Sequence, residues 1–172
     1  TIAHDAAERY INDWIASGTM PEDIKVFAKG TPDPRAIASM RAVEAFFHKH
    51  DIIPLASEIL VGDKRYSAGT LDFLCLMDGN LTLIDFKTSN GVDQLSYSAQ
   101  VAAYKYFFEG MTGLKIKACK ILHLSKDYDK FTVYKVNNAG KAWRAFKHMC
   151  AVHKWMYEKD EKISKDVKRM KI

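Results

Sequence analysis

The amino-acid sequence predicts a mixed α/β (α+β) fold, in which helices flank one mixed sheet within a single domain, residues 1–172. Three observations predict it. The length of 172 residues suits one domain. No internal repeat and no Pro-, Gly- or Ser-rich linker divides the chain. The spacing of apolar residues alternates between helical and strand periods in the order α-α-β-β-β-α-β-β-α.

Two helices are expected before the first strand. Apolar residues return at helical spacing within 1–17, which predicts the first helix. A loop at 30–34 follows, and Asp33 or Pro34 begins a second helix that runs to about His50.

Three strands are expected next, at 55–61, 65–77 and 81–88, with turns at 62–63 and 78–79 between them. The second strand is apolar on both faces over 71–77, which is typical of a central strand.

The remaining elements are a helix at 94–109, strands at 115–124 and 130–136, and a long helix from Asn138 to about Glu161. One face of the long helix carries apolar residues at helical spacing: Ala142, Phe146, Met149, Val152 and Met156.

Positive charge is concentrated at the C-terminus. The net charge is +5, yet residues 141–172 alone carry ten Lys or Arg against four acids. Such a segment can bind a polyanion such as nucleic acid, although a solvated helical face would have the same composition. The candidate phosphate-contacting residues are Lys141, Arg144, Lys147 and Lys154.

The composition excludes several classes of protein. A chain with 48% hydrophobic and 27% charged residues is neither disordered nor collagen-like. No apolar run approaches the roughly 20 residues of a membrane span, so no membrane partner is expected. Three scattered cysteines make no disulfide framework, which favours a reducing cytoplasm.

Charged residues interrupt the apolar middle strands. Alternation places Asp85 and Lys87 on one face of their strand, with Ile84 and Phe86 on the other. Asp72 interrupts an apolar run in the same way. Buried carboxylates are costly unless they are paired or bind a cation, so a site for a hard divalent cation is one interpretation. A surface ion pair is the simpler alternative for an isolated Asp and Lys.

Four short motifs occur in order on the expected elements: Thr1-Ile2-Ala3-His4 with Glu8, Gly69-Thr70-Leu71-Asp72, Asp85-Phe86-Lys87-Thr88, and Gln100 with Tyr104. In this order, over roughly residues 1–136, the chain resembles the PD-(D/E)xK nuclease superfamily, specifically its RecB-like branch. The Gly that opens the family's first motif would precede Thr1.

The resemblance implies a restriction-endonuclease-like core (αβββαβ) and a metal-dependent deoxyribonuclease, most typically an exonuclease. One or two Mg²⁺ or Mn²⁺ ions would be held by His4, Asp72, Asp85 and the backbone carbonyl of Phe86. Glu58 would accept a metal-bound water or a second ion.

The resemblance also assigns the remaining roles. Lys87 would orient the attacking water and neutralise developing charge, and Gln100 and Tyr104 would position the water or the DNA backbone. The DNA partner would be single-stranded or a duplex end, tracked by the basic segment from 138 to 172. Three cysteines cannot supply a four-cysteine iron–sulfur cluster, so none is expected. Any helicase or recombination partner would be separate, because the chain has no Walker A loop.

Two other interpretations stay open. The chain could be a catalytically inactive nucleic-acid-binding module, or an unrelated metal-binding or structural domain. Outside its motif, His4 would be read as a solvated side chain near a chain end. The intact set of Asp72, Asp85 and Lys87 favours an enzyme, because an inactive domain need not keep buried charges that cost stability.

Overall fold

The computed structural model describes residues 2–28, 33–91, 93–126 and 129–169, with side chains described up to residue 157. Within these ranges the elements follow the predicted order, with a short 3-10 helix (η1) in addition. They are α1 (Ile2–Ser17), η1 (Ile24–Phe27), α2 (Pro34–Lys49), β1 (Ile52–Asp63), β2 (Ser67–Met77), β3 (Asn80–Lys87), α3 (Gln94–Thr112), β4 (Ala118–Leu124), β5 (Phe131–Lys135) and α4 (Ala139–Arg169).

The strands form one mixed sheet in the order β1-β2-β3-β4-β5. Neighbouring strands are antiparallel except β3 and β4, which are parallel and joined by the crossover helix α3. The prediction of an α/β class with a mixed sheet is therefore confirmed. β2 lies between β1 and β3, as expected from a strand that is apolar on both faces.

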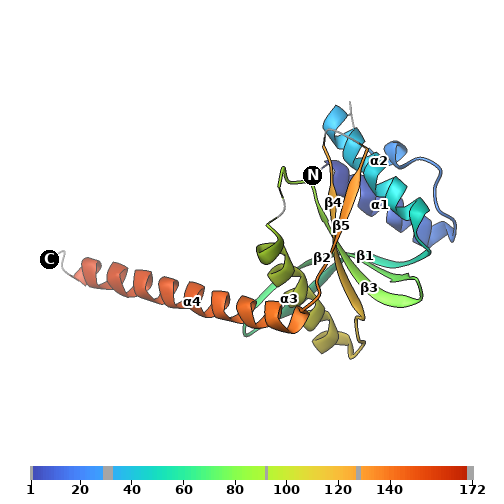
Figure 1. The fold of residues 1–172 in the computed structure, drawn as a ribbon. Helices are drawn as coiled ribbons and strands as arrows, with labels where there is room; N and C mark the ends of the chain where they lie inside the picture. The colour runs from blue at the N-terminus through green and yellow to red at the C-terminus, as the bar shows by residue number, and fades with distance from the viewer. Residues whose placement is uncertain (1, 29–32, 92, 127–128, 170–172) are drawn as a thin grey trace.

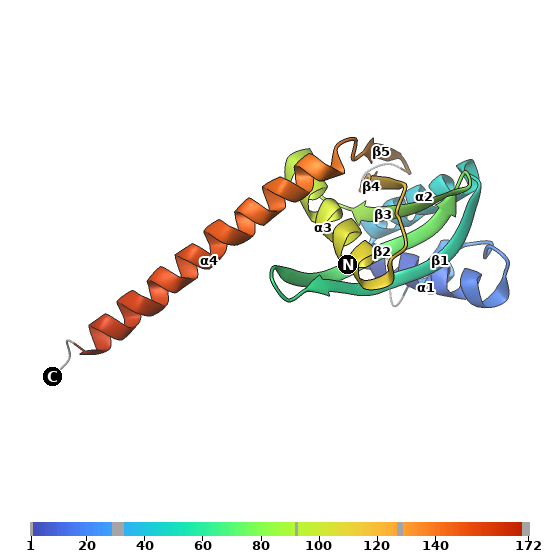
Figure 2. The ribbon, with the colours of Figure 1, turned by 90° about the horizontal axis from the view of Figure 1, so that it is seen from below.

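Helices cover both faces of the sheet (Figure 1 and Figure 2). α1 and α2 pack on one face over a core that includes Phe73, Ile84 and Phe86. α3 and the first turns of α4 pack on the other face, over a second core that includes Leu83 and Ile121. Because Ile84 and Phe86 enter the first core, the alternation of β3 directs Asp85 and Lys87 toward α3.

α4 leaves the body of the protein and projects away from it (Figure 1 and Figure 2). Trp143 and Phe146 pack against α3 and the second core, whereas Met149 is 50% exposed and Trp155 is 56% exposed. Despite its 31 residues, α4 is too polar to span a bilayer, and no helix in the described part of the chain could do so.

The predicted turn at 62–63 is wrong. Gly62 and Asp63 both pair with β2, and the turn occupies residues 64–66. The carboxylate of Asp63 accepts the backbone N–H of Arg65 at 2.9 Å, and the Asp63 carbonyl accepts the N–H of Tyr66 at 2.9 Å. An Asp side chain that bonds two residues ahead stabilises such a turn, so the chain reverses after Asp63.

Several element ends also differ from the prediction, and among them β4 begins at Ala118 rather than at 115. β1 begins at Ile52 and includes Pro54, which an edge strand tolerates because one side of it needs no backbone donor. α3 continues past 109 to Thr112 and is capped by Gly113, whose φ of 76° suits glycine. α4 continues past 161 to Arg169. Most of the expected loop at 30–34 lies outside the described residues.

Candidate active site

The candidate site forms where β2 and β3 separate. Their pairing ends at Phe73 and Ile84, which leaves the edge of β3 beyond Ile84 without a strand partner on the β2 side. Two side chains bind the backbone N–H and carbonyl of Phe86 in place of a neighbouring strand. Asp72 Oδ2 accepts the Phe86 N–H at 2.8 Å, and His4 Nε2–H donates to the Phe86 carbonyl at 2.9 Å. Buried backbone groups need such partners, so this exchange holds α1, β2 and β3 together.

Asp85 and Lys87 form an ion pair on the α3 side of β3. The Lys87 ammonium lies 2.7 Å from Asp85 Oδ2, and the two side chains are 18% and 1% exposed. Within the described residues no hydrogen-bond donor is well directed at this oxygen. The ring of Tyr97 lies 5.0 Å from the Lys87 ammonium, so the cation is confined between a carboxylate and an aromatic face.

Burial controls the protonation of these groups. It raises the pKa of Asp72 and the pKa of Asp85 to about 6 each, and the nearby Lys87 opposes both shifts. Asp72 raises the pKa of Asp85 further because like charges repel. Burial lowers the pKa of His4, so its imidazole is neutral at pH 7.

An open pocket of about 380 Å³ adjoins Asp72 and His4. We call it the acidic pocket; its lining residues are His4, Asp5, Glu8, Glu58 and Asp72. Glu58 lies opposite Asp72 across β1 and β2, since the residues on either side of each are paired. Burial raises the pKa of Glu58, and the carboxylates of Glu8 and Asp5 raise it further. The acidic pocket therefore concentrates negative charge that a cation would relieve.

Glu58 also has an unusual backbone. Its φ is 49°, in the left-handed region that residues with a Cβ rarely adopt. This conformation costs on the order of 1–2 kcal/mol in a non-glycine residue. Strain of this kind collects at functional sites, and here it falls on the acid that the sequence motifs assign to a second ion or a bound water.

Gln100 and Tyr104 form a hydrogen-bonded pair on α3, with Gln100 Nε2 donating to the Tyr104 hydroxyl at 2.9 Å. The Tyr104 ring lies against the backbone of Gly69: a Cβ built at Gly69 would come within 2.7 Å of Tyr104 Cε1. Burial raises the pKa of Tyr104, and the charges of Asp85 and Asp72 raise it further. The Gln–Tyr pair therefore lies near both carboxylates.

The structure thus brings together most of the residues that the motifs indicated, and leaves others apart. Thr1 lies outside the described residues. Four basic residues are placed on α4 and do not line the acidic pocket: Lys141, Arg144, Lys147 and Lys154.

Two residues of the site were not predicted from the sequence. Tyr97 contacts Lys87 and Asp5 lines the acidic pocket. Their only sequence signal is position, on the first turn of α3 and beside His4 on α1.

The donor set can be compared with the needs of a divalent cation. The carboxylates of Asp72 and Asp85 and the carbonyl of Phe86 are hard oxygen donors of the kind that Mg²⁺ and Mn²⁺ prefer. The buried Asp85 Oδ2 is an oxygen to which no donor is well directed among the described residues. No three His, Cys, Asp or Glu side chains of the described part of the chain form a preformed metal centre. The donors fit chemically, and the Lys87 and His4 contacts would open to admit a cation.

Comparisons with known proteins do not assign the chain to a family. No protein-family model and no curated protein matches the chain. Among solved structures 13 chains match. One of them, described as "Crystal structure of SSO0001", has 12% sequence identity and a TM-score of 0.38, and the match covers 88% of this chain and 72% of that chain. A likeness of this size carries no argument about function.

Proposed function

We propose that the chain is a divalent-metal-dependent deoxyribonuclease of the PD-(D/E)xK type, in its RecB-like branch, and that it acts as an exonuclease. One observation carries the proposal. Side chains from α1, β2 and β3, far apart in the sequence, converge on the edge of β3 that β2 leaves unpaired: His4, Asp72, Asp85 and Lys87. A structural role alone would not require two neighbouring carboxylates at a site where burial disfavours their charge.

Asp72, Asp85 and the Phe86 carbonyl would hold the cation. His4 would add a nitrogen donor once its bond to that carbonyl opens and the ring proton moves from Nε2 to Nδ1. When bound, a divalent cation supplies a Lewis acid that polarises the phosphoryl oxygen and lowers the pKa of water. Glu58 would hold a water or a second cation in the acidic pocket.

The chain's own groups would do the rest. Lys87 would place its positive charge where negative charge develops on the phosphoryl oxygens, because Asp85 and the Tyr97 ring confine its ammonium. The Tyr104 hydroxyl, fixed by Gln100, would orient the attacking water or a phosphate oxygen. Neutral His4 would hold the Phe86 carbonyl in place until the cation binds.

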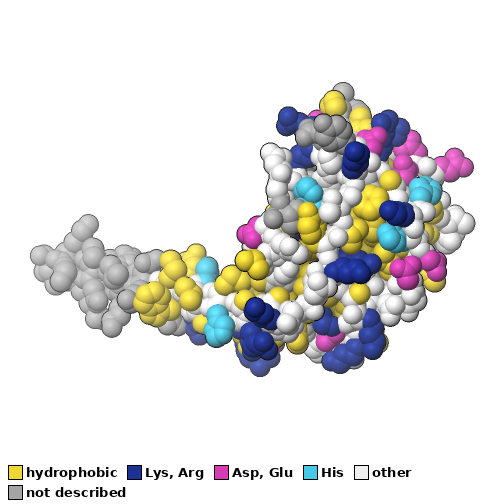
Figure 3. All heavy atoms as spheres, in the orientation of Figure 1, with side chains coloured by type: hydrophobic (Ala, Val, Ile, Leu, Met, Phe, Trp, Pro, Cys, Tyr) yellow, Lys and Arg dark blue, Asp and Glu magenta, His cyan; other side chains and the backbone are white. Residues whose placement is uncertain are grey.

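DNA is the proposed substrate, single-stranded or at a duplex end. The support is electrostatic: α4 displays Lys141 and Arg144 on its exposed surface, and positively charged side chains gather around its start (Figure 3). These residues lie apart from the acidic pocket, so they would bind the backbone of DNA at a distance from the bond that is cleaved.

The test is incubation of the protein with end-labelled single-stranded and duplex DNA, with Mn²⁺ and with EDTA. The proposal predicts shortening of the DNA in Mn²⁺ and none in EDTA, with mononucleotides or short products released from ends. A retarded band without cleavage in Mn²⁺ would support an inactive binding module. Neither retardation nor cleavage would support an unrelated domain.

A further inference from the structure

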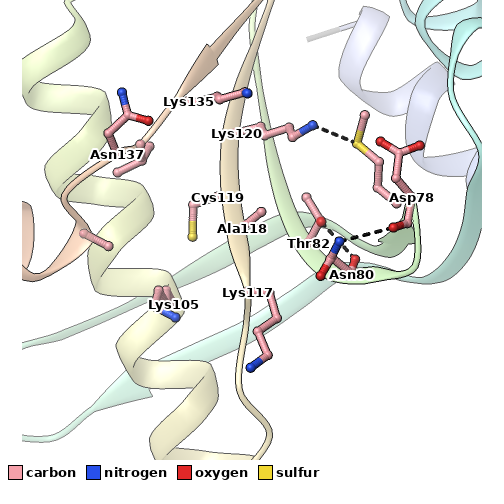
Figure 4. Close-up of a pocket in the computed structure, with 13 residues that line it drawn as sticks. Asp78, Asn80, Thr82, Lys105, Lys117, Ala118, Cys119, Lys120, Lys135 and Asn137 are labelled. Atoms are coloured by element: carbon pink, nitrogen blue, oxygen red, sulfur yellow. Dashed lines mark hydrogen bonds between the residues drawn. The ribbon is translucent and has the colours of Figure 1, made fainter.

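A second pocket lies at the other end of the sheet from the candidate active site. β3 runs from Asn80, which lines this pocket, to Lys87, which belongs to the active site. We call it the basic pocket. Its volume is about 380 Å³, and its lining includes four lysines and one acid: Lys105, Lys117, Lys120, Lys135 and Asp78 (Figure 4). None of the site residues indicated by the sequence motifs lies in it.

Two of these lysines form an unfavourable pair. Lys120 on β4 and Lys135 on β5 are directly opposite each other in the antiparallel register. Opposed side chains of this kind lie on the same face, with Cα atoms roughly 4.5–5.5 Å apart, and like charges at such positions are destabilising. Figure 4 shows the two side chains extending in the same direction. The register therefore places two lysine side chains, one partly buried and one exposed, next to each other on one face of the sheet.

Neither lysine is neutralised by the protein. The partially buried Lys120 ammonium lies 3.2 Å from the sulfur of Met77, which is a weak acceptor (Figure 4). Across the described residues, no carboxylate forms an ion pair with Lys120 or Lys135. The acid that lines the pocket, Asp78, is exposed. Two neighbouring lysines without a carboxylate partner therefore form a suitable binding site for an anion from outside the protein.

The other lysines of the basic pocket do not share this arrangement. Lys105 is already paired with Glu109 and bonds the carbonyl of Ile116. Lys117 extends away from the Lys120 and Lys135 pair in Figure 4. Lys120 and Lys135 are therefore the two candidate ligands for an anion.

We propose that Lys120 and Lys135 bind a phosphate group. Lysine side chains at opposed positions on adjacent strands can reach oxygens of one phosphate or of two adjacent phosphates, and lysine binds phosphate as a point charge. The phosphate could belong to a nucleic-acid backbone or to a free nucleotide. A backbone is the better fit, because Ala139, the first residue of α4, lines the basic pocket and the exposed Lys141 follows it. Binding of a nucleic-acid backbone at this site rests on the proposed function, whereas binding of a free nucleotide does not.

The first test uses inorganic pyrophosphate in EDTA at constant ionic strength, with the thermal unfolding midpoint as the readout. Pyrophosphate should raise the midpoint of the wild type. It should leave the midpoint of Lys120→Gln/Lys135→Gln unchanged. The matched control is Lys25→Gln/Lys64→Gln, which removes two lysines elsewhere on the surface and should respond as the wild type does. Without ligand, the pocket variant should be at least as stable as the wild type, because a repulsion is removed.

The second test distinguishes the two sources of phosphate. Binding of a fluorescent duplex oligonucleotide is measured against salt in EDTA, where no cleavage occurs. A backbone source predicts that the pocket variant lowers the slope of log affinity against log salt by about 1.8, at about 0.9 for each phosphate that is no longer neutralised, with the control unchanged. An unchanged slope, together with the absence of a pyrophosphate response in the pocket variant, assigns the site to a free nucleotide.

The proposal is overturned if the pocket variant and the control variant respond alike to both ligands. Because both measurements are made in EDTA, they do not depend on metal-assisted cleavage. Failure of the nuclease assay would leave the phosphate site standing, and failure here would leave the proposed active site untouched.

Discussion

Asp85 is the buried charged residue of the described chain, at 1% exposure, and its position explains much of the site. A carboxylate in such a place loses its hydration, and a single ion pair with Lys87 only partly compensates. Burial raises the pKa of Asp85 to about 6 even with that lysine beside it. The residue is therefore destabilising as an anion in the metal-free protein, and a bound cation would remove that cost.

Stability in EDTA should consequently fall as pH rises through the range of this titration. A carboxyl whose folded pKa is about 6 and whose ordinary value is 3.8 holds its proton longer in the folded state. The unfavourable contribution of this carboxyl to the free energy of folding is absent below about pH 4 and complete above about pH 6. Its size is about 1.4 kcal/mol for each unit by which folding raises the pKa. The stability of Asp85→Asn relative to the wild type should therefore be greater at pH 7.5 than at pH 4.

Chemical denaturation at several pH values measures this difference. Asp13→Asn, at an exposed position on α1, is the matched control and should follow the wild type throughout. A stability difference for Asp85→Asn that does not change between pH 4 and pH 7.5 would contradict the effect assigned to its burial.

Glu58 offers a second prediction at this scale, since its backbone strain and its charge can be separated. Glu58→Ala removes the charge but keeps a Cβ at a φ of 49°, whereas Glu58→Gly removes both. Glu58→Gly should therefore be more stable than Glu58→Ala by about 1 kcal/mol, measured as the free energy of unfolding. Both should cleave DNA more slowly than the wild type. Equal stability of the two variants would mean that the left-handed backbone is not a source of strain.

At the scale of elements, the contact between β2 and α3 is set by a glycine. A Cβ at Gly69 would meet the Tyr104 ring at 2.7 Å, so Gly69→Ala must displace either the ring or the strand. We expect the free energy of unfolding to fall by about 1–3 kcal/mol, together with a lower cleavage rate at saturating DNA.

Gly110→Ala supplies the control for this substitution. Gly110 lies inside α3, and a Cβ there meets nothing within 4 Å. Alanine should therefore stabilise the helix by roughly 0.5–1 kcal/mol and leave cleavage unchanged. If Gly69→Ala behaves like Gly110→Ala, then Tyr104 is not held by β2.

The order of elements was predictable because each has a strong local pattern. The alternation of Ile84, Asp85, Phe86 and Lys87 is a local property, and the structure confirms the faces it assigns. The position of the turn after Asp63 was not predictable in this way. Gly62-Asp63 has the composition of a turn, but the Asp63 carboxylate accepts the backbone N–H of Arg65, and the chain reverses at residues 64–66 instead. Likewise α4 extends beyond the apolar pattern that predicted it, because the polar residues that follow this pattern also favour helix.

The site was predictable only in part, because its geometry comes from long-range contacts. Motif order indicated His4, Asp72 and Asp85, and the structure places them around the β3 edge. No sequence pattern shows that the residues of β2 before Phe73 do not pair with β3, or that His4 bonds the Phe86 carbonyl.

At the scale of the whole molecule, α4 gives the protein an arm (Figure 2). Its first turns pack against α3 through Trp143 and Phe146, so the distal part of α4 should not contribute to the stability of the body. A chain ending at Lys159 should keep the unfolding midpoint of the full chain. Its affinity for DNA should depend less steeply on salt, because five lysines or arginines are removed. The measurement is a salt titration of binding in EDTA, and an unchanged slope would mean that the distal helix does not contact phosphates.

The central claim is that the cluster around Asp85 catalyses metal-dependent cleavage. Its most direct test is the single-turnover rate of DNA cleavage in saturating Mn²⁺ for the wild type, Asp85→Asn and the exposed control Asp13→Asn on α1. We predict cleavage by the wild type and the control, and a rate at least about 100-fold lower for Asp85→Asn, with DNA affinity retained. Equal rates for the wild type and Asp85→Asn, or no Mn²⁺-dependent cleavage by the wild type, would contradict this claim.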